Sequence, residues 1–395
     1  MRNNKKDFYT LIILFGVVSL LADIVYEGAR SISGDYINYL RGPAIAAGLI
    51  GAGELLGYGF RFVSGVFSLK FRSEKFLWAI VFVGYAIQAV FIPLLAFTGS
   101  WGIAVILYLL ERVGKGLRTP ARDALLAEVS KSVGRGLGFG IHEVLDQLGA
   151  ITGPLLVGLT YSYGGYRPAF LILAVPGALN LLTLFYLMKK YYLLKPATVG
   201  DTQKYGGSAS DLTISDRNAL LYFLFVAFIS IGFIHWSIIS YYMSYELGKN
   251  ASEIAYLYSI AMLADALIAI PIGVLFDKNG LRTLLLVPSL ALFLPVFLVL
   301  ATSTLFRVLS AIVFGLVMSA FETILRSAIP LFVAKEKLAY VYGVFGLIQG
   351  TSWFAGSMII SYLYQTYGKI TAFIYLPIPA TMISLVLLLV ITKKE

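Results

Sequence analysis

Two neighbouring stretches decide how this chain folds: ERVGKGLRTPARDALLAEV at residues 111–129 and GFGIHEVLDQLGAITGPLLVG at residues 138–158. Both have the length of membrane helices, yet they concentrate ionisable residues in a chain that is otherwise strongly apolar. A charge at the centre of a bilayer costs on the order of 3 kcal/mol even on the mildest insertion scale, so it persists only where it is paired or has a function. We therefore expect these two helices to face a polar interior and to carry the chemistry of the protein.

The overall composition indicates an integral membrane protein. Of the 395 residues, 59% are hydrophobic and 13% are charged, which is too little polar surface to cover a globule of this size. Twelve apolar stretches are long enough, at about 20 residues, to cross a bilayer core of about 30 Å as helices. They lie near residues 9–38, 43–68, 76–98, 102–127, 136–162, 167–188, 217–246, 252–275, 283–302, 305–328, 337–364 and 369–392. The first is followed by no small-residue cleavage site, so we expect it to be retained.

The distribution of Lys and Arg predicts the orientation. With both termini in the cytoplasm, 19 basic residues lie in cytoplasmic segments, and only five lie in external ones: Arg41, Arg167, Lys249, Arg307 and Lys369. This asymmetry follows the positive-inside rule, and it requires an even number of spans. We expect a multi-pass protein of the cell membrane with both termini cytoplasmic. The same asymmetry accounts for the net charge of +10, so nucleic-acid binding is not indicated.

A polar segment divides the chain into two halves. We expect an N-terminal six-helix bundle at 1–188, a cytoplasmic linker at 189–216 and a C-terminal six-helix bundle at 217–395. An offset of 203 residues aligns glycines and aromatic residues of the two halves: Gly140 with Gly343, Gly153 with Gly356, Tyr161 with Tyr364, Gly165 with Gly368, Ala169 with Ala372 and Phe170 with Phe373. The predicted fold is all-α, with twelve transmembrane helices in two pseudo-symmetric six-helix bundles.

One stripe of the fourth span is ionisable, because four of its residues recur at helical spacing: Glu111, Lys115, Arg118 and Arg122. This stripe should line a water-filled cavity, where Arg112, Lys115 and Arg118 are candidate substrate-binding residues. Arg122 with Asp123 is expected to close the cytoplasmic end of the span as a gate. The alternative for this last pair is an interfacial ion pair with a purely structural role.

The first span carries Asp23 and Glu27, one helical turn apart. Two carboxylates on one face in a low dielectric resist ionising together, so one of them can hold a proton near neutral pH. Together with Glu111 they are the best candidates for proton coupling. The alternative is a static salt bridge from either acid to Arg30 or to a base of the fourth span.

In the fifth span His142 and Asp146 share one face with Gly149 and Gly153. The two glycines should let another helix approach closely, which places the ionisable pair at a helix interface. We take Asp146 as a further proton-coupling candidate and His142 as a substrate-binding candidate. The alternative is a buried histidine that hydrogen-bonds to its helix neighbour.

The second half has fewer ionisable residues inside its spans. His235, Trp236, Tyr241 and Gln349 are the candidates there for binding an amphipathic or aromatic solute. The alternative for the aromatic residues is ordinary packing or an interfacial belt. Asp277 and Arg326 are expected to pair as a latch at the cytoplasmic face.

The segment PIGVLFDKNGLRT at 271–283 resembles the loop signature GxxxD(R/K)xGxR of the major facilitator superfamily of secondary transporters. The matching residues are Gly273, Asp277, Lys278, Gly280 and Arg282. The resemblance assigns Lys278 and Arg282, with Asp277, to gating. In the equivalent N-terminal loop, SGVFSLKFRSEK at 64–75, Gly65 and Lys70 are kept but Leu69 replaces the family's aspartate.

Two further patterns resemble the same family. Arg112, Lys115 and Gly116 are similar to the fourth-helix pattern RxxQG, with lysine in place of glutamine. The fifth-helix pattern GxxxGPxxG, which the family associates with antiporters, is matched by Gly149, Gly153, Pro154 and Gly158. DIVYEG in the first span and GKGLRTPARDALLAE in the fourth are similar to drug-efflux-like prokaryotic members.

These observations predict a proton-coupled secondary transporter that works by alternating access. We expect an antiporter that exports a small amphipathic or drug-like solute, without a cofactor or metal, as a monomer in the lipid bilayer. One alternative is a proton-coupled symporter that imports an organic anion. Another is a divalent-metal exporter in which Asp23, His142 and His235 converge.

Enzymes are the remaining class of alternatives. The chain has no cysteine, no HExxH and no GxxxxGK[ST] motif, so these sequence signatures of thiol catalysis, zinc hydrolysis and nucleotide hydrolysis are missing. A lipid-modifying enzyme would need a nucleophile and a base facing one leaflet, and no such group is recognisable. We therefore do not expect an enzyme.

Overall fold

The computed structural model describes residues 5–71, 73–131, 133–194, 217–332 and 338–393. Every regular element within these ranges is a helix, which confirms the predicted all-α fold. Of the predicted linker at 189–216, only the residues up to 194 belong to the described part, as the end of α9 (Ala174–Leu194).

The number of spans agrees with the sequence. Eight helical segments of the described residues are long and apolar enough to cross a membrane. One of them, Ala251–Val299, holds two spans, because α12 (Ala251–Asn279) ends at Gly280, whose φ of +57° a residue with a side chain rarely adopts. Three more spans, whose composition is more polar, are formed by α3 with α4 and by the long helices α6 and α7. Together they make the twelve that were predicted.

The chain forms two compact units by its contacts, and their boundary falls within α4. The first comprises Met1–Ser31 and Gly59–Tyr205, and the second comprises Ile32–Tyr58 and Gly206–Glu395. The helices of the first unit are α1 (Lys5–Ser31), most of α4 (Ala52–Phe71), α5 (Glu74–Leu94), η1 (Leu95–Phe97), α6 (Trp101–Ser130), α7 (Arg135–Gly164), α8 (Tyr166–Leu171) and α9.

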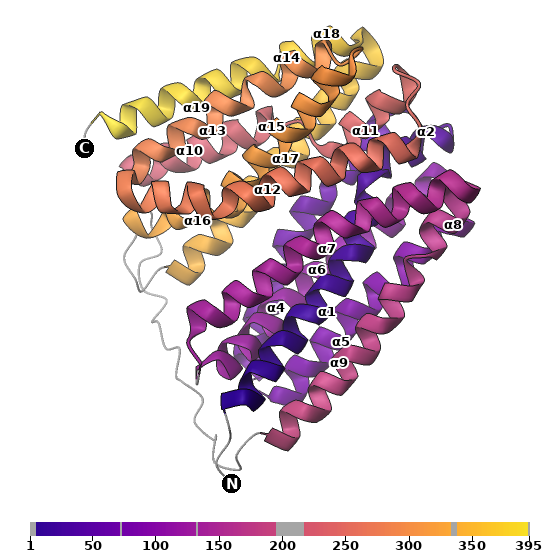
Figure 1. Cartoon of the computed structure of the whole chain (residues 1–395). Coiled ribbons are helices and arrows are strands. Elements are labelled where there is room, and N and C mark those ends of the chain that lie inside the picture. Colours follow the sequence, from indigo (N-terminus) through magenta and orange to yellow (C-terminus); the bar gives the residue numbers. More distant parts are fainter. Residues whose placement is uncertain (1–4, 72, 132, 195–216, 333–337, 394–395) are drawn as a thin grey trace. The chain divides into compact units, whose positions relative to one another are not determined.

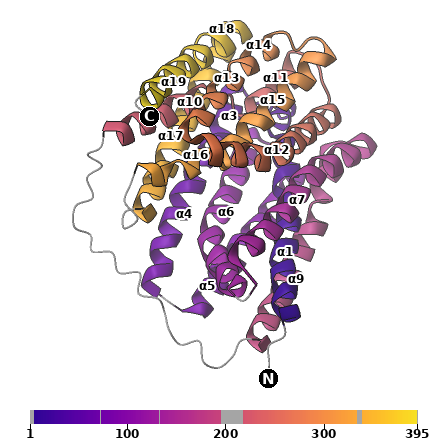
Figure 2. The ribbon, with the colours of Figure 1, turned by 60° about the vertical axis from the view of Figure 1, so that its left-hand side comes forward.

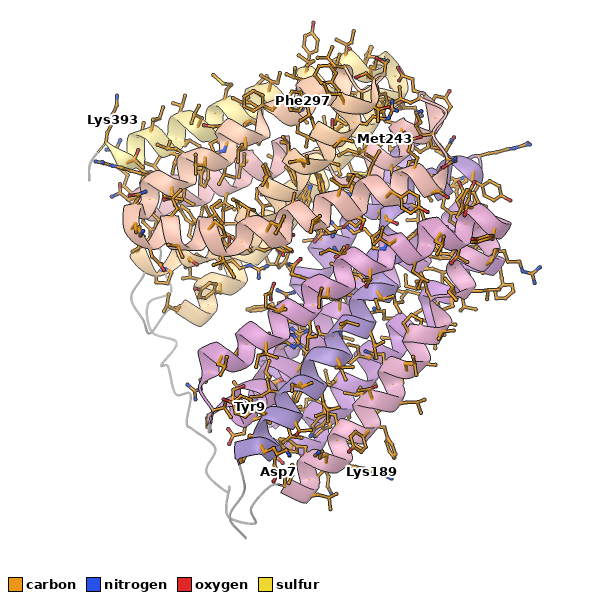
Figure 3. The ribbon with its side chains drawn as sticks, viewed as in Figure 1. Asp7, Tyr9, Lys189, Met243, Phe297 and Lys393 are labelled. Carbon is orange, nitrogen blue, oxygen red and sulfur yellow. The ribbon has the colours of Figure 1, made fainter. Side chains whose placement is uncertain are left out.

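Helix α1 lies at the centre of the first unit. It packs lengthwise against α7 and α9, while α5 packs against α6 (Figure 1). Apolar side chains around Phe15, Trp78 and Tyr85 form the core at one end of these helices. Figure 3 shows Asp7 and Lys189 at that same end, so the start of α1 and the end of α9 lie together, as an even number of spans requires.

The predicted close approach of α7 to another helix is confirmed, and the partner is α1. A methyl group at Gly149 would overlap the carbonyl oxygen of Leu20, and one at Gly153 would overlap that of Ile24. Only glycine leaves room for the backbones to come this close. The contact brings the polar faces of α1 and α7 together.

The second unit contains many short helices. They are α2 (Ser33–Tyr39), α3 (Ala44–Ile50), α10 (Arg217–Gly232), α11 (Trp236–Tyr245), α12, η2 (Gly280–Leu285), α13 (Leu286–Ala291), α14 (Phe293–Val299), α15 (Thr304–Glu322), α16 (Ile324–Ser327), η3 (Ile329–Leu331), α17 (Leu338–Tyr367), α18 (Lys369–Ile374) and α19 (Pro377–Thr392). Helix α12 packs against α15, and α10 packs against α17 and α19 (Figure 2). One span is interrupted between α10 and α11, where α11 packs against α2 and α3.

Ion pairs stabilise the connections between helices at one end of the second unit. Arg307, which the sequence assigned to an external segment, lies in the first turn of α15 and is 4% exposed. Its Nε lies 3.0 Å from Glu253 Oε1, and its Nη1 donates to the carbonyl oxygens of Ala301 and Thr302 at 3.0 and 2.8 Å. A buried guanidinium thus holds the connection between α14 and α15.

Candidate functional site

The ionisable residues predicted in the first half lie together in the first unit, on α1, α6 and α7. We call them the N-terminal polar cluster: Asp23, Glu27, Arg30, Glu111, Arg112, Lys115, Arg118, Arg122, His142 and Asp146. Six of the ten are buried: Asp23, Glu27, Arg30, Glu111, Arg118 and His142. The cluster forms because each helix presents its residues at helical spacing on the side that faces the other two.

Tyr26 on α1 lies in the middle of the basic residues of this cluster. The Lys115 ammonium nitrogen lies 4.1 Å from the centre of the Tyr26 ring, and the Arg112 guanidinium carbon lies 4.4 Å from it. The Tyr26 hydroxyl accepts a hydrogen bond of 2.6 Å from Arg30 Nη1. These are cation–π distances, which attract a cation to the ring face in place of water. Tyr26 belongs to the DIVYEG segment, but no role was predicted for it from the sequence.

The acids of α1 and α6 lie among these bases. Glu111 interacts electrostatically with Arg112, Arg118 and Lys115, in that order of strength. A distance of 3.8 Å separates Glu27 Oε1 from Arg30 Nη1. The predicted alternative of a salt bridge from an α1 acid to Arg30 is therefore realised for Glu27.

Asp23 is 5% exposed, and another acid is among the charged groups around it. The charged groups within its electrostatic reach are Asp146 on α7, Lys115, Glu27 and Arg118. A buried carboxylate and a half-buried one from different helices thus act on each other, and two such acids resist ionising together.

A hydrogen-bonded chain joins α6, α1 and α7 at Ser19. Arg122 Nη1 donates to Ser19 Oγ at 3.2 Å, and Ser19 Oγ donates in turn to Asp146 Oδ1. Arg122 Nε and Nη2 also donate to Asp123 Oδ1 at 2.9 and 2.8 Å, so the predicted Arg122–Asp123 ion pair is formed. His142 is buried one turn before Asp146, within the electrostatic reach of Arg122.

The four binding candidates of the second unit divide into two kinds. Trp236 packs between Tyr258 and Phe314, at ring-centre distances of 4.7 and 5.2 Å, and the Tyr241 hydroxyl donates to the carbonyl oxygen of Gly42 at 3.0 Å. Both are buried and serve packing, which is the alternative that the sequence left open. His235 and Gln349 instead belong to a polar group.

That group includes two residues of α4 that the sequence analysis did not assign, Glu54 and Tyr58. The Tyr58 hydroxyl donates to Gln349 Oε1 at 3.0 Å and accepts from Arg326 Nη2 at 3.3 Å. Glu54, one turn earlier on α4, has its Oε1 3.8 Å from His235 Nε2. The sequence did contain a signal for this polar group: Glu54 is a carboxylate inside the otherwise apolar stretch 43–68.

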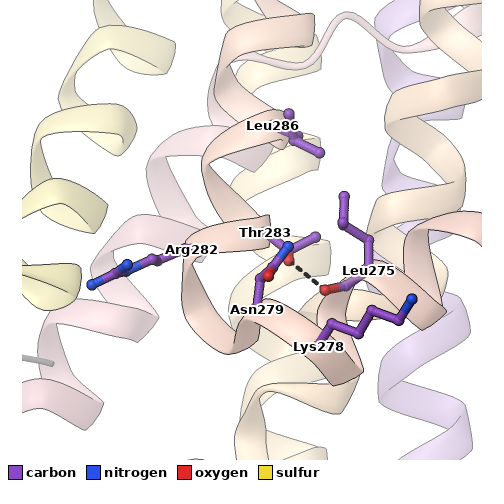
Figure 4. Close-up of a pocket in the computed structure, with 6 residues that line it drawn as sticks. All are labelled: Leu275, Lys278, Asn279, Arg282, Thr283 and Leu286. Atoms are coloured by element: carbon purple, nitrogen blue, oxygen red, sulfur yellow. Dashed lines mark hydrogen bonds between the residues drawn. The ribbon is translucent and has the colours of Figure 1, made fainter.

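The gating residues of the loop signature surround a pocket of about 560 Å³ at the end of α12. It is lined by Leu275, Lys278, Asn279, Arg282, Thr283 and Leu286. In Figure 4 the Lys278 and Arg282 side chains extend to opposite sides, and the Thr283 hydroxyl donates to the carbonyl oxygen of Leu275 at 3.0 Å. Asp277 is exposed, and Arg326 Nη2 donates to the Tyr58 hydroxyl. The pairing of Asp277 with Arg326 as a latch stays a prediction.

A metal site is not supported by the arrangement of ligands. The described residues contain no group of three or more His, Asp or Glu side chains that could hold a metal ion. The alternative of a metal exporter, in which Asp23, His142 and His235 converge, stays a prediction, because His235 belongs to the other unit.

Comparison with known proteins places the chain in one family. The family model described as Major Facilitator Superfamily matches residues 15–242 and 219–395. An uncharacterized protein of Mycobacterium tuberculosis is 35% identical over 362 residues, which cover 90% of this chain and 87% of that protein. An uncharacterized MFS-type transporter of Methanocaldococcus jannaschii is 34% identical over 191 residues, 47% of each chain.

A solved structure shares the fold. The crystal structure of the nucleoside transporter NupG has a TM-score of 0.74 at 14% identity, and the match covers 97% of this chain and 98% of NupG. At this identity the likeness concerns the fold and not the substrate. With the family match across nearly the whole chain and the loop signature at 271–283, the conclusion is that the chain belongs to the major facilitator superfamily.

Proposed function

We propose that this protein is a proton-coupled secondary transporter that works by alternating access and exports a small amphipathic solute in exchange for protons. The observation that carries the proposal is the N-terminal polar cluster, in which four carboxyl groups and five permanent bases are buried or half-buried on facing helices. A membrane protein without a charged substrate or a coupling ion has no use for so many charges at this depth.

Proton coupling is assigned to Asp23, Glu27, Glu111 and Asp146. Protonation of one of them removes a buried negative charge and leaves a neighbouring base without its counter-charge. The two protonation states then favour different arrangements of the helices, and this difference is what couples proton binding to opening on one side. Asp23 and Asp146 act on each other electrostatically although they lie on different helices, α1 and α7.

The balance of charges bears on the substrate. Counting Asp123, five acids face the five bases Arg30, Arg112, Lys115, Arg118 and Arg122, so the ionised cluster is neutral and has no preference for an anion. A neutral or cationic amphipathic solute fits this state better. The direction of transport rests on the fifth-helix pattern alone, since GxxxGPxxG is associated with antiport in this family.

A second candidate, import of an organic anion with protons, follows from the same count. When one acid is protonated, the cluster gains a net positive charge, which attracts an anion. Substrate and proton would then enter together, and the protein would be a symporter. The two candidates therefore differ in the sign of proton movement when a substrate is added.

The experiment uses purified protein in proteoliposomes that contain a trapped pH dye. Lipophilic cations, organic anions and nucleosides are added outside without an imposed gradient. A more alkaline lumen shows that protons leave as the solute enters, which is antiport, whereas acidification shows symport. If no solute of the panel moves protons, or if the protein turns over lipid without moving a solute, the proposal is wrong.

Two substitutions connect the result to the cluster. Asp23→Asn and Glu27→Gln should each abolish proton-driven transport and leave exchange of substrate for substrate intact. Glu143→Gln is the matched control, because this carboxylate is exposed on α7 outside the cluster. Normal proton-driven transport in both cluster variants would remove Asp23 and Glu27 as proton carriers.

A further inference from the structure

In the second unit, a histidine caps the helix that follows the interruption between α10 and α11. His235 is the N-cap residue of α11, and its Nδ1 accepts a hydrogen bond of 3.2 Å from the Ser237 backbone N–H. Backbone groups freed by a broken helix at membrane depth need such partners. Asparagine, aspartate and serine are the usual N-caps, so a histidine that is 2% exposed at this point calls for another explanation.

The other ring nitrogen of His235 lies near a carboxylate. His235 Nε2 lies 3.8 Å from Glu54 Oε1, and the Glu54 side chain is 12% exposed. Both residues belong to the second unit. The acids of the N-terminal polar cluster belong to the first unit.

We propose that Glu54 and His235 form a second proton-binding site, located where the span of α10 and α11 is interrupted. The proposal goes beyond the assignment of coupling to the N-terminal polar cluster, and it rests on the proposed function only for the use that transport makes of the proton. Its ligand is a proton from water, taken up by the imidazole next to an ionised carboxylate.

Hydrogen-bond partners are present for both forms of the imidazole. In the neutral form Nδ1 accepts from the Ser237 N–H, and Nε2–H points toward Glu54. In the cationic form Nδ1–H donates to Ser237 Oγ, which lies 2.7 Å away. That hydroxyl can accept, because its own hydrogen is donated to the carbonyl oxygen of Ala47 at 2.7 Å. His235 can thus gain or lose a proton without leaving its place.

The same hydrogen bonds connect the proton to the packing of helices. Ala47 lies on α3, which leads directly into α4 and Glu54. A change of protonation replaces the bond that caps α11 by one that joins His235, through Ser237, to α3. The site therefore lies at a contact between α3 and α11 that is able to change with protonation.

Other charged groups near the site are few. Of the elements packed against α11, α2 carries Asp35, α3 carries no charged residue, and α12 carries Glu253, Asp265, Asp277 and Lys278. Arg326 on α16 contacts Tyr58, one turn beyond Glu54, and α17 has no charged residue. Asp35 and Asp265 are the buried acids of these elements.

The fluorescence of a neighbouring tryptophan can report on the protonation of His235. The rings of His235 and Trp353 meet edge to face at a centre distance of 5.4 Å. An imidazolium quenches indole fluorescence more strongly than a neutral imidazole. We therefore measure tryptophan fluorescence of the purified full chain between about pH 5 and pH 8, the range in which histidine changes its charge. The Trp353 signal is the difference between the wild type and Trp353→Phe.

The expected result is a sigmoidal loss of this signal as the pH falls. His235→Asn should abolish the sigmoid and keep the fold, because asparagine can still cap α11. Glu54→Gln should move the midpoint to lower pH by about one unit, since the counter-charge of the imidazolium is lost. His142→Gln, which removes the other of the two histidines of the chain, should leave the midpoint of the Trp353 signal where it is in the wild type.

Three results would overturn the proposal: no sigmoid in the wild type, a sigmoid that survives His235→Asn, or an unmoved midpoint in Glu54→Gln. If His235→Asn does not fold, the proposal is still tested by the shift of the midpoint in Glu54→Gln, with Trp353→Phe as the reference for the signal. The fluorescence titration needs no substrate, so it is independent of the proteoliposome result. If the titration gives a sigmoid but no solute moves protons in proteoliposomes, the proton site is supported and the transport proposal is refuted. If a solute moves protons but the titration gives no sigmoid, only the proton site is refuted.

Discussion

Lys115 places its ammonium nitrogen 4.1 Å from the centre of the Tyr26 ring, and Arg112 approaches the same ring at 4.4 Å. A buried aromatic ring of α1 therefore contacts two bases of α6 at once. A partly desolvated cation–π contact contributes about 1–2 kcal/mol, and a change of about 1.4 kcal/mol corresponds to a factor of ten.

Tyr26→Leu should accordingly lower the initial rate of transport in proteoliposomes at least tenfold. Tyr26→Phe keeps the ring and loses only the hydroxyl that accepts from Arg30, so most of the activity should remain. If both substitutions reduce transport equally, the hydroxyl and not the ring is the essential part of Tyr26.

The packing of α7 on α1 gives a prediction for stability. Gly153→Ala should lower the free energy of unfolding by about 1–3 kcal/mol, because the added methyl group overlaps the carbonyl oxygen of Ile24. Gly140→Ala, on the same helix, meets nothing within 4 Å and should be neutral or stabilising by up to about 1 kcal/mol. Thermal unfolding in detergent measures both. Equal melting temperatures for the two variants would contradict the close approach.

Some of this geometry could be predicted from the sequence because it is local. The stripe of Glu111, Lys115 and Arg118 follows from helical spacing, and Gly149 with Gly153 marks a surface that another helix can approach closely. Side-chain spacing defines one helix surface at a time. It therefore indicated that α7 has a close neighbour, but not that the neighbour is α1.

Contacts between helices could not be predicted in the same way. The position of Tyr26 under two bases depends on how α1 and α6 are rotated against each other, and the approach of Glu54 to His235 joins residues far apart in the chain. Trp236 shows the opposite difficulty. Its aromatic ring made it a candidate for binding an amphipathic or aromatic solute, whereas its neighbours Tyr258 and Phe314 place it in the core.

The link between α6 and α7 through Ser19 can be measured by a double-mutant cycle. Ser19→Ala removes the donor of this hydrogen bond and Asp146→Asn removes the charge of its acceptor, so their effects on the free energy of unfolding should not add, with a coupling of about 0.5–3 kcal/mol. Ser64→Ala is the control, because its hydroxyl donates to the carbonyl oxygen of Leu117 and not to Asp146. Its effect should add to that of Asp146→Asn. Additivity in the Ser19 cycle would show that the chain from Arg122 to Asp146 is not stabilising.

Two bases contact one acid at the connection between α14 and α15, and they should differ in their contribution to stability. Arg307 and Lys249 both pair with Glu253, at 3.0 and 3.4 Å. The Arg307 side chain is 5% exposed and also holds two backbone carbonyl groups, whereas the Lys249 side chain is 26% exposed.

Arg307→Ala should lower the free energy of unfolding by about 3–5 kcal/mol, because it leaves a carboxylate and two carbonyl groups without their buried donor. Lys249→Ala should cost less than about 1 kcal/mol, as surface pairs do. Arg307→Lys keeps the charge but not the planar fork, and should fall between the two. Thermal unfolding of the three variants measures the order. A loss for Lys249→Ala as large as that for Arg307→Ala would mean that charge alone, and not the buried hydrogen bonds of the guanidinium, stabilises this connection.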